Sequence, residues 1–373
     1  MQRLREIKNK LWKGSCKSMM IRKLGKEEHD KSRQLYETVF FEDEKCFVDY
    51  YYQYRARENV IFTAEDEAGL HAMVHLNPCR IAWNGRLMEI NYLVAVATEE
   101  KYRHQGLMRS LLELALKEED KRKAPFLFLM PASEAIYTPF GFRRAWSWRW
   151  EDEIMDRQAA YGLQAAAAGG PVWIPAKECG EAELTELSRR VNKRLAQSFS
   201  MFSWRSPAYY QRLAKEQEAS GGRLEVLFEK GMPVTARCSA REEFPPMMAR
   251  IVNLEAFLAR VQTKQERTCI WQIHDELLPD NCGLFQVTLT GKGGHLRRLR
   301  EMEAAADDST YGNMYDPEPE NAGTDENRQD PGIMNVIASG KRKQPVRKLD
   351  ISRIPEALGE DNPFLHAMIC EVV

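Results

Sequence analysis

The sequence lacks the features of several protein classes. Its eight cysteines form no Cys-x-x-Cys pair and its seven histidines are equally scattered, so a structural zinc site has no support and reduced, packed thiols are expected. No apolar run approaches the roughly 20 residues that span a bilayer. The 54 basic residues are balanced by 55 acidic ones, whereas nucleic-acid binding normally requires a basic excess. We therefore predict a protein that binds no metal, no membrane and no nucleic acid.

The amino-terminal end lacks an apolar segment of the signal-peptide type. Residues 1–18 are basic and have the composition of an extension, and the folded chain is expected to begin at residue 19. The absence of an apolar h-region indicates a cytoplasmic enzyme. A length of 373 residues exceeds the usual size of a single core, so two or three domains are expected.

What the sequence does contain is a strand, a turn and a helix in succession. Residues 90–97 (INYLVAVA) are apolar and uncharged, which is typical of a buried strand. After Gly106, leucines up to Leu116 fall mainly on one helical face. The turn between these elements is Arg103-His104-Gln105-Gly106. A helix is therefore predicted to begin directly after a basic, glycine-containing turn.

This turn has the composition of a phosphate site. The first N–H groups of a helix have no intrahelical partner and lie at the positive end of its dipole, so they can hold a pyrophosphate. Gly106 allows close approach of the backbone, and Arg103 and Arg109 add positive charge. On this pattern alone, an ordinary strand-turn-helix unit with a basic cap remains the alternative.

A second segment follows about twenty residues later. It consists of an apolar strand at 125–130 (PFLFLM), then Ala132 to Phe142 (ASEAIYTPFGF), then an alternating stretch from Trp146 to Trp150 that predicts another strand. The two segments together resemble the GCN5-related N-acetyltransferases (GNAT), in which an Arg-x-x-Gly-x-Gly/Ala turn precedes an Ile-Tyr-x-x-x-Gly-Phe segment. Met108 departs from that pattern, because the superfamily usually has Gly or Ala there.

Three details resemble the Eis-like branch of this superfamily: a larger apolar residue after Gly-Leu, the segment Met247 to Leu258 (MMARIVNLEAFL), and the ending Ile369 to Val373 (ICEVV). The resemblance implies an α/β (α+β) fold with two tandem GNAT-like mixed sheets and flanking helices, followed by a sterol-carrier-protein-like domain. It also implies a homo-oligomer, a hexamer. The expected domains are 19–152, which binds acetyl-CoA, 153–246, which lacks the cofactor turn, and 247–373, with a polar loop at 302–332.

The resemblance also assigns a cofactor site. Acetyl-CoA is the expected co-substrate, with no metal. Backbone groups at the end of the first strand would polarise the thioester carbonyl and bind the pantetheine arm. The implied contacts are Val96, Ala97, Thr98, Arg103, His104, Gln105, Gly106, Leu107, Met108, Arg109, Ala132 and Ser133.

Two further residues are expected to carry the chemistry. Tyr137 matches the family tyrosine that protonates the leaving thiolate, and a phenol with an ordinary pKa of about 10 is protonated at neutral pH. The alternative is a tyrosine that packs beneath the strands. For the base, the resemblance implies the terminal carboxylate of Val373, with Glu371 as the competing candidate. A buried apolar chain end whose carboxylate meets solvent is the alternative to both.

The sequence leaves the acceptor open. The expected activity is N-acetylation of a lysine-like or aminoglycoside-like amine, by direct attack on the thioester. A peptide or protein N-acetyltransferase of narrower range and a non-catalytic acyl-CoA or apolar-ligand binding protein are the alternatives. In Eis-like proteins the helices predicted here at 27–39 and 44–57 line the acceptor pocket, but their aromatic residues could equally be core. These residues are Phe40, Phe41, Phe47, Tyr50, Tyr51, Tyr52 and Tyr54.

The remaining pattern predicts ordinary elements. His71 and His75 are interpreted as sheet residues, and Asn84-Gly85 signals a hairpin. The other expected strands are 59–65, 70–80, 86–98, 223–228, 233–238, 268–273 and 283–289, and the other expected helices are 181–197 and 207–217.

Overall fold

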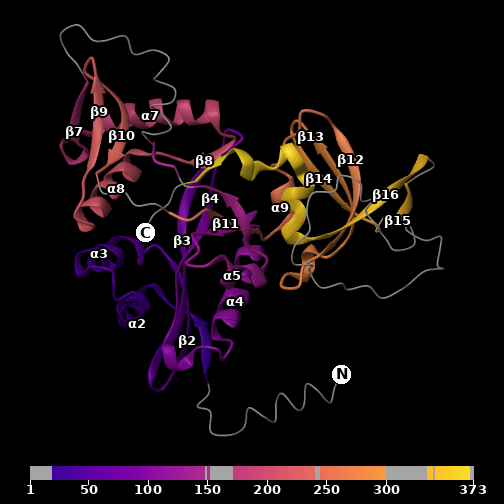
Figure 1. The fold of residues 1–373 in the computed structure, drawn as a ribbon, viewed down its shortest axis with the longest axis horizontal. Coiled ribbons are helices and arrows are strands. Elements are labelled where there is room, and N and C mark those ends of the chain that lie inside the picture. Colours follow the sequence, from indigo (N-terminus) through magenta and orange to yellow (C-terminus); the bar gives the residue numbers. More distant parts are fainter. Residues whose placement is uncertain are drawn as a thin grey trace, which may run out of the picture. The chain divides into compact units, whose positions relative to one another are not determined.

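The computed structural model describes residues 19–147, 149–151, 171–239, 244–299, 334–338 and 341–369 (Figure 1). They form two compact units. Unit 1 contains the described residues up to Val252 together with Pro363–Ile369, and unit 2 contains those from Asn253 to Asn362. Sheets and flanking helices make up both units, so the predicted mixed α/β class is confirmed. No helix within these ranges is long and apolar enough to cross a membrane.

The main sheet of unit 1 has nine strands in the described part of the chain. Seven follow the order β1-β2-β3-β4-β5-β11-β6, while β8 pairs with the far end of β3 and with β17. The pairs β4–β5 and β8–β17 are parallel. The strands are β1 (Met20–Lys23), β2 (Val60–Asp66), β3 (Gly69–Trp83), β4 (Arg86–Thr98), β5 (Phe126–Leu129), β6 (Arg143–Trp146), β8 (Met201–Ser203), β11 (Met247–Ile251) and β17 (Ala367–Met368).

Helices lie on both faces of this sheet (Figure 1). On one face, residues of α2 (Arg33–Val39), α3 (Lys45–Tyr50) and the π-helix η2 (Tyr51–Arg55) pack against Met73, Ala95 and Ala97. On the other face lies α4 (Leu107–Lys121), whose Glu119 accepts a hydrogen bond from Asn91 Nδ2 on β4. The β3–β4 hairpin is confirmed, with positive φ at both Asn84 and Gly85.

Strand β11 enters the main sheet from far along the chain. It lies between β5 and β6 and is antiparallel to both. The sequence places the start of the third domain at residue 247, whereas this segment belongs to unit 1. Strand β6 ends at Trp146, where its pairing with β11 ends, so the alternation up to Trp150 does not continue the strand. Trp148 lies outside the described residues.

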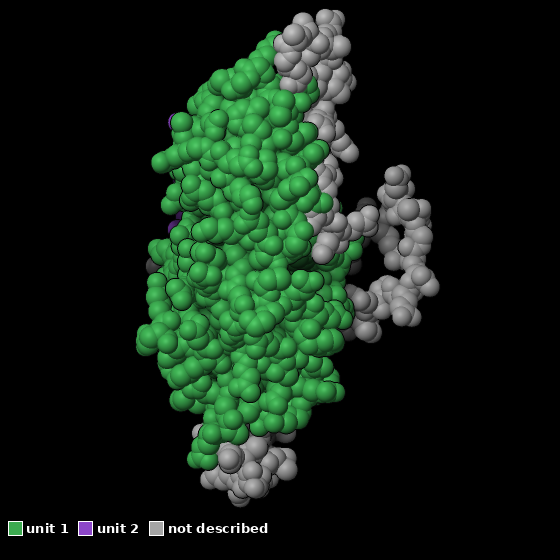
Figure 2. Space-filling view, turned by 90° about the vertical axis from the view of Figure 1, so that its left-hand side faces the viewer, with its two compact units in different colours: residues 1–252, 363–373 green, residues 253–362 purple. Residues whose placement is uncertain are grey.

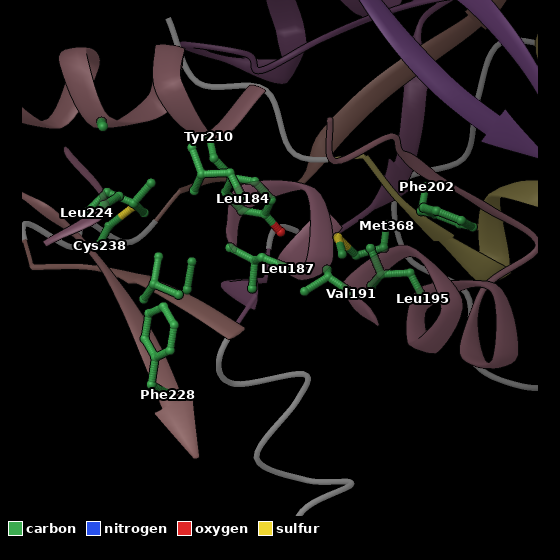
Figure 3. Packing of buried hydrophobic residues seen from close by; sticks show 14 of the residues in the cluster. Leu184, Leu187, Val191, Leu195, Phe202, Tyr210, Leu224, Phe228, Cys238 and Met368 are labelled. Atoms are coloured by element: carbon green, nitrogen blue, oxygen red, sulfur yellow. The ribbon is translucent and has the colours of Figure 1, made fainter. Parts of the chain in front are cut away.

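A smaller sheet completes unit 1, and its core also includes residues of the main-sheet strands β3, β8 and β17. Strands β7 (Val172–Pro175), β9 (Leu224–Glu229) and β10 (Met232–Cys238) form it, with α7 (Glu181–Ser198) and α8 (Pro207–Ala219) beside them. Leucine and valine side chains at helical spacing on α7 face Leu224, Phe228 and Cys238, and Met368 from the chain end joins this cluster (Figure 3). Unit 1 presents one continuous surface in the space-filling view (Figure 2). The predicted helices at 181–197 and 207–217 and the predicted strands at 223–228 and 233–238 are confirmed.

Unit 2 contains a five-stranded sheet in the order β14-β13-β12-β16-β15. The predicted strands at 268–273 and 283–289 are confirmed as β12 and β13. The predicted polar loop at 302–332 lies outside the described residues. The bounds are α9 (Leu254–Leu258), β12 (Arg267–His274), β13 (Gly283–Thr290), β14 (Gly293–Arg298), β15 (Met334–Ala338), β16 (Lys341–Asp350) and α10 (Ile354–Leu358).

Candidate functional site

Strands β4 and β5 part after a short contact. They share two residue pairs, the second between Leu93 and Leu129, where β5 ends. Strand β4 continues to Thr98, and two residues after the last pair Ala95 has a φ of 48°. The register with β3 shifts at this point, as in a β-bulge, and a bulge bends a strand. In the described part of the chain no strand pairs with this side of β4 beyond Leu93, which leaves an open edge.

The backbone groups of β4 can be assigned to its two edges. Glu99 N donates to His71 O on β3 at 2.9 Å. Because successive residues of a strand direct their backbone groups to opposite edges, Ala97 also faces β3. Val96 and Thr98 therefore direct theirs to the open edge. Two of the three backbone contacts expected for the cofactor lie where a ligand strand could add.

The turn that follows β4 is exposed and is held by its own side chains. Arg103 Nε donates to Thr98 O at 3.2 Å, and Gln105 Nε2 donates to Lys101 O at 3.1 Å. Arg103, His104 and Gln105 are all exposed to solvent. The positive charge of Arg103 thus lies beside the open edge of β4.

Helix α4 begins without a cap. Gly106 is its N-cap residue with a φ of 81° and supplies no side-chain hydrogen bond. A Cβ there would meet no atom within 4 Å, so conformation rather than space favours glycine. Leu107 is buried and Met108 is half-buried. The first turn contains no acidic residue, so its N–H groups form a positive end that suits an anion.

Arg109 connects this first turn to the segment after β5. Its guanidinium lies 5.0 Å from the ring centroid of Phe140. Its ion pair with Glu113 is long, at 3.7 Å between Nη1 and Oε1, and exposed. Such a pair contributes little, so Arg109 can turn its charge to a phosphate.

Ala132 and Ser133 lie at the other side of the opening, just after β5. Both are exposed. Ser133 is the N-cap residue of α5 (Glu134–Tyr137), but its hydroxyl makes no capping hydrogen bond. Their position after the end of β5 brings them to the point where β4 and β5 separate.

Tyr137 is the last residue of α5 and is 7% exposed. Its ring meets Phe142 edge-on, with centroids 6.1 Å apart. Burial raises its pKa to about 12, which keeps the phenol protonated at neutral pH. Among the described residues its hydroxyl has no hydrogen-bond partner.

Arg250 of β11 is a residue of this site that the sequence analysis missed. It is buried, and its Nη1 donates to Phe140 O at 2.7 Å. Gly141 has a φ of 81°, and a Cβ there would lie 2.3 Å from the same Nη1. The guanidinium thus fixes the turn that follows Tyr137. An arginine within the apolar run at 247–252 is the signal that could have indicated this role.

The tyrosine-rich helices α2, α3 and η2 pack against β4 at its bulge near Ala95. Tyr36, Tyr51 and Tyr52 are buried together with Ala95 and Ala97, and the rings of Tyr36 and Tyr51 stack with centroids 5.0 Å apart. Tyr50 is also buried, whereas Phe41 is 77% exposed. Of the seven aromatics, Phe40, Phe47 and Tyr54 are half-buried. Three of the seven, Tyr50, Tyr51 and Tyr52, are therefore core, as the alternative interpretation expects.

Both histidines noted in the sequence lie in β3, as predicted. His75 is fully buried, its Nδ1 is 2.8 Å from Tyr51 Oη, and burial lowers its pKa to about 3. His71 lies between two carboxylates, Asp66 and Glu99. Among the described residues there is no group of three or more side chains that could hold a metal ion.

The chain end returns to the main sheet. Trp146 Nε1 donates to Ile369 O at 2.9 Å, and the Phe364 ring packs against Phe126 and Trp146. Val373 and Glu371 lie outside the described residues, so their roles as base stay predictions.

Comparison with known proteins identifies part of this architecture. Residues 20–145 match the sequence family described as acetyltransferase (GNAT) domain. This segment contains the parted strands, the turn and Tyr137. The chain therefore carries a GNAT acetyltransferase domain, and the prediction of an acyltransferase enzyme is confirmed at that level. None of the curated proteins matches the chain.

Solved structures share the fold over a longer span. A conserved protein of unknown function from Enterococcus faecalis V583 has a TM-score of 0.57 at 14% identity, covering 76% of this chain and 86% of its own. A GCN5-related N-acetyltransferase from Anabaena variabilis has the same score and coverage at 16% identity. Eis1 from Mycobacterium abscessus has a TM-score of 0.55 at 13% identity, covering 75% and 85%. At these identities the likeness is one of fold.

Proposed function

We propose that this protein transfers the acetyl group of acetyl-CoA to an amine. The observation that carries the proposal is the open edge of β4, which lies directly before a basic turn and an uncapped helix. The open edge suits an extended arm, and the helix terminus suits a pyrophosphate. The match to the GNAT domain supports the same assignment.

Each part of the coenzyme has a candidate partner. The pyrophosphate would bind the first-turn N–H groups at Gly106 to Met108, with charge from Arg103 and Arg109. The pantetheine arm would follow Val96 and Thr98, and Ala132 and Ser133 would lie on its other side. His104 and Gln105, exposed in the turn, complete the contacts. The site requires no metal for this chemistry.

The transfer would proceed by direct attack. The amine nitrogen forms a bond to the thioester carbon, the carbon–sulfur bond breaks, and the sulfur takes a proton from Tyr137. The amine gives up its proton to a base, which we propose to be the carboxylate of Val373 or of Glu371. Tyr137 is left as a phenolate and takes a proton back from solvent before the next turnover, which its raised pKa favours.

The acceptor is the part of the proposal with alternatives. We favour a lysine-like or aminoglycoside-like amine, because the sequence resembles the Eis-like branch at Met247–Leu258 and at its end. A peptide or protein N-acetyltransferase would use the same coenzyme site and the same chemistry, and would differ only in its acceptor. A non-catalytic binding protein is less consistent with an exposed basic turn and a buried, protonated phenol in the same domain.

The proposal is tested by assaying thiol release from acetyl-CoA with a panel of small amines, aminoglycosides and lysine peptides. Calorimetric binding of coenzyme A is measured in parallel. Blanks without acceptor are needed because Cys46 is exposed and reacts with thiol reagents. Binding with turnover is expected for at least one amine. Coenzyme binding without turnover on any acceptor would favour the non-catalytic alternative, and no binding would contradict the proposal.

Three further proposals accompany this one. The resemblance to Eis-like proteins suggests a hexamer and a sterol-carrier-like identity for the third domain, and the expected location is cytoplasmic. The mass of the protein in solution, measured by light scattering, tests the hexamer. Binding of a fluorescent fatty acyl or sterol probe tests whether the third domain holds an apolar ligand.

A further inference from the structure

His71 is an extra residue in its strand. Along the β2–β3 ladder Ala64 pairs with Ala72 and Glu65 pairs with Leu70, which leaves His71 without a partner on β2. An extra residue of this kind redirects its side chain. The histidine is nevertheless only 3% exposed, so the bulge points the imidazole to an enclosed position at the end of the sheet.

Both ring nitrogens contact carboxylates there. Nε2 lies 2.8 Å from Asp66 Oδ1 at the end of β2, and Nδ1 lies 2.9 Å from Glu99 Oε2 after β4. A neutral imidazole has one N–H, and ionised carboxylates only accept hydrogen bonds. Both contacts are hydrogen bonds only if both nitrogens carry protons. The geometry therefore favours the imidazolium form with two ionised carboxylates.

A second cation balances the charge of this group. Lys101 Nζ lies 2.8 Å from Glu99 Oε1, so two cations meet two carboxylates. The pKa of Glu99 is lowered, first by Lys101 and also by His71. Loss of the imidazolium proton would leave one carboxylate facing a ring lone pair. The cluster would then carry a net negative charge beside a turn that is built for an anion.

The cluster around His71 contacts the residues that come just before the basic turn at 103–106. The His71 and Tyr102 rings stack with centroids 3.9 Å apart and an interplanar angle of 23°. His71 O also accepts from Glu99 N. Tyr102 precedes Arg103, the first residue of the basic turn. One histidine on β3 thus holds both ends of the segment Glu99 to Tyr102.

We propose that His71, as an imidazolium, is a positioning residue for the coenzyme turn. The inference rests on the proposed function, because it takes the turn to bind acetyl-CoA. The charged and titratable groups that face the ring are Asp66 from β2, and Glu99, Lys101 and Tyr102 from β4 and its extension. Loss of its two carboxylate contacts releases the turn and weakens coenzyme binding.

The test compares wild type with His71→Gln. We expect the variant to raise the KM for acetyl-CoA about tenfold, the effect of losing a buried charged hydrogen bond, with kcat within about twofold. Coenzyme A affinity is measured by calorimetry from mildly acidic to mildly alkaline pH. The coenzyme phosphates titrate equally with both proteins, so the difference between the two profiles isolates His71. His295→Gln, an exposed histidine of β14, should leave KM and its pH dependence unchanged.

The protonation state has a readout of its own. Nitrogen NMR of histidine-labelled protein reads the protonation of both His71 ring nitrogens directly, and a neutral tautomer throughout the pH range in which coenzyme A binds would overturn the inference. If His71→Gln does not fold, Glu99→Gln serves instead and should reproduce the rise in KM. Unchanged KM and pH dependence in a folded variant also overturn the inference. Failure of the wild type to bind coenzyme A would instead contradict the proposed function, and the NMR result would still decide the imidazolium.

Discussion

Two helices of unit 1 begin at a glycine, and their first turns have opposite chemistry. Helix α4 begins at Gly106 in a left-handed conformation, with no cap and no acidic residue in its first turn. Helix α7 begins at Gly180 in extended backbone, and its N–H donates to Glu183 Oε2 at 2.8 Å. Glu181 adds a second carboxylate there. The first turn of α4 is uncapped and carries Arg109, whereas the first turn of α7 is capped and carries two carboxylates.

Because of this difference, the N-terminus of α4 can bind a phosphate and the N-terminus of α7 cannot. A carboxylate at the third helical position satisfies the orphan N–H and neutralises the positive end of the helix. The sequence predicts that the second region binds no coenzyme, because it lacks the Arg-x-x-Gly turn. Glu183 adds a physical reason for that prediction.

The largest effect is expected on kcat, and it tests whether the chemistry is confined to the region around α4. Tyr137→Phe should lower kcat about a hundredfold to ten-thousandfold, since it removes the proton donor, while steady-state and calorimetric measurements show coenzyme affinity nearly unchanged. Tyr209→Phe in α8 makes the same change in the second region and should retain full kcat. If both variants turn over like wild type, Tyr137 is not the acid.

The next effect concerns the backbone at the open helix start. Gly106→Val places a β-branched residue at a φ of 81°, and the strain or the shift that relieves it should raise the KM for acetyl-CoA at least about tenfold. Gly231→Val is the matched control, because Gly231 has a φ of 74° and equally open surroundings in the β9–β10 turn. It should lose similar stability in thermal melts yet bind coenzyme A normally. Equal losses of affinity in both variants would contradict a local role for Gly106.

A smaller effect comes from converting one helix start into the other. Arg109 occupies the third position of α4, as Glu183 does in α7. Arg109→Glu should weaken coenzyme A about tenfold in calorimetry, because it replaces an attractive charge by a repulsive one. Arg109→Gln should fall between wild type and Arg109→Glu. An Arg109→Glu variant with undiminished affinity would show that the charge of this turn does not select the ligand.

The smallest effect is expected at α7. Glu183→Ala removes the contact to Gly180 and should lower the free energy of unfolding by about 0.5–1 kcal/mol in urea titrations. Coenzyme affinity should not change. Gln197→Ala, an exposed site in the last turn of α7, controls for the helix propensity of alanine and should cost nothing. A loss of coenzyme binding in Glu183→Ala would undo the contrast between the helices.

Much of the site could be predicted because its signals are local. The apolar run before Thr98, the turn at Arg103–Gly106 and the leucine spacing of α4 all lie within one short stretch, and the structure has these elements at the predicted positions. The Asn84-Gly85 hairpin is equally local.

The missed features depend on partners far apart in the chain. Arg250 and Phe140 are separated by 110 residues, and no periodicity in either segment announces their contact. Strand β6 ends opposite Met247, where its partner β11 begins, which the alternation of tryptophans does not reveal. The bulge at His71 arises from the register with β2, and register is a property of two strands rather than of one.

Because β11 lies between β5 and β6 but comes more than 100 residues after β5 in the sequence, the main sheet cannot be completed early in synthesis. Strands β5 and β6 are synthesised well before β11, which pairs with both. The segment Pro363–Ile369, whose Ile369 O accepts a hydrogen bond from Trp146, follows after all of unit 2. A nascent chain therefore exposes two sheet edges that invite pairing with other chains. A fragment that stops before Met247 keeps those edges. The proposed site of acetyl transfer is thus completed only after Pro363–Ile369 has left the ribosome.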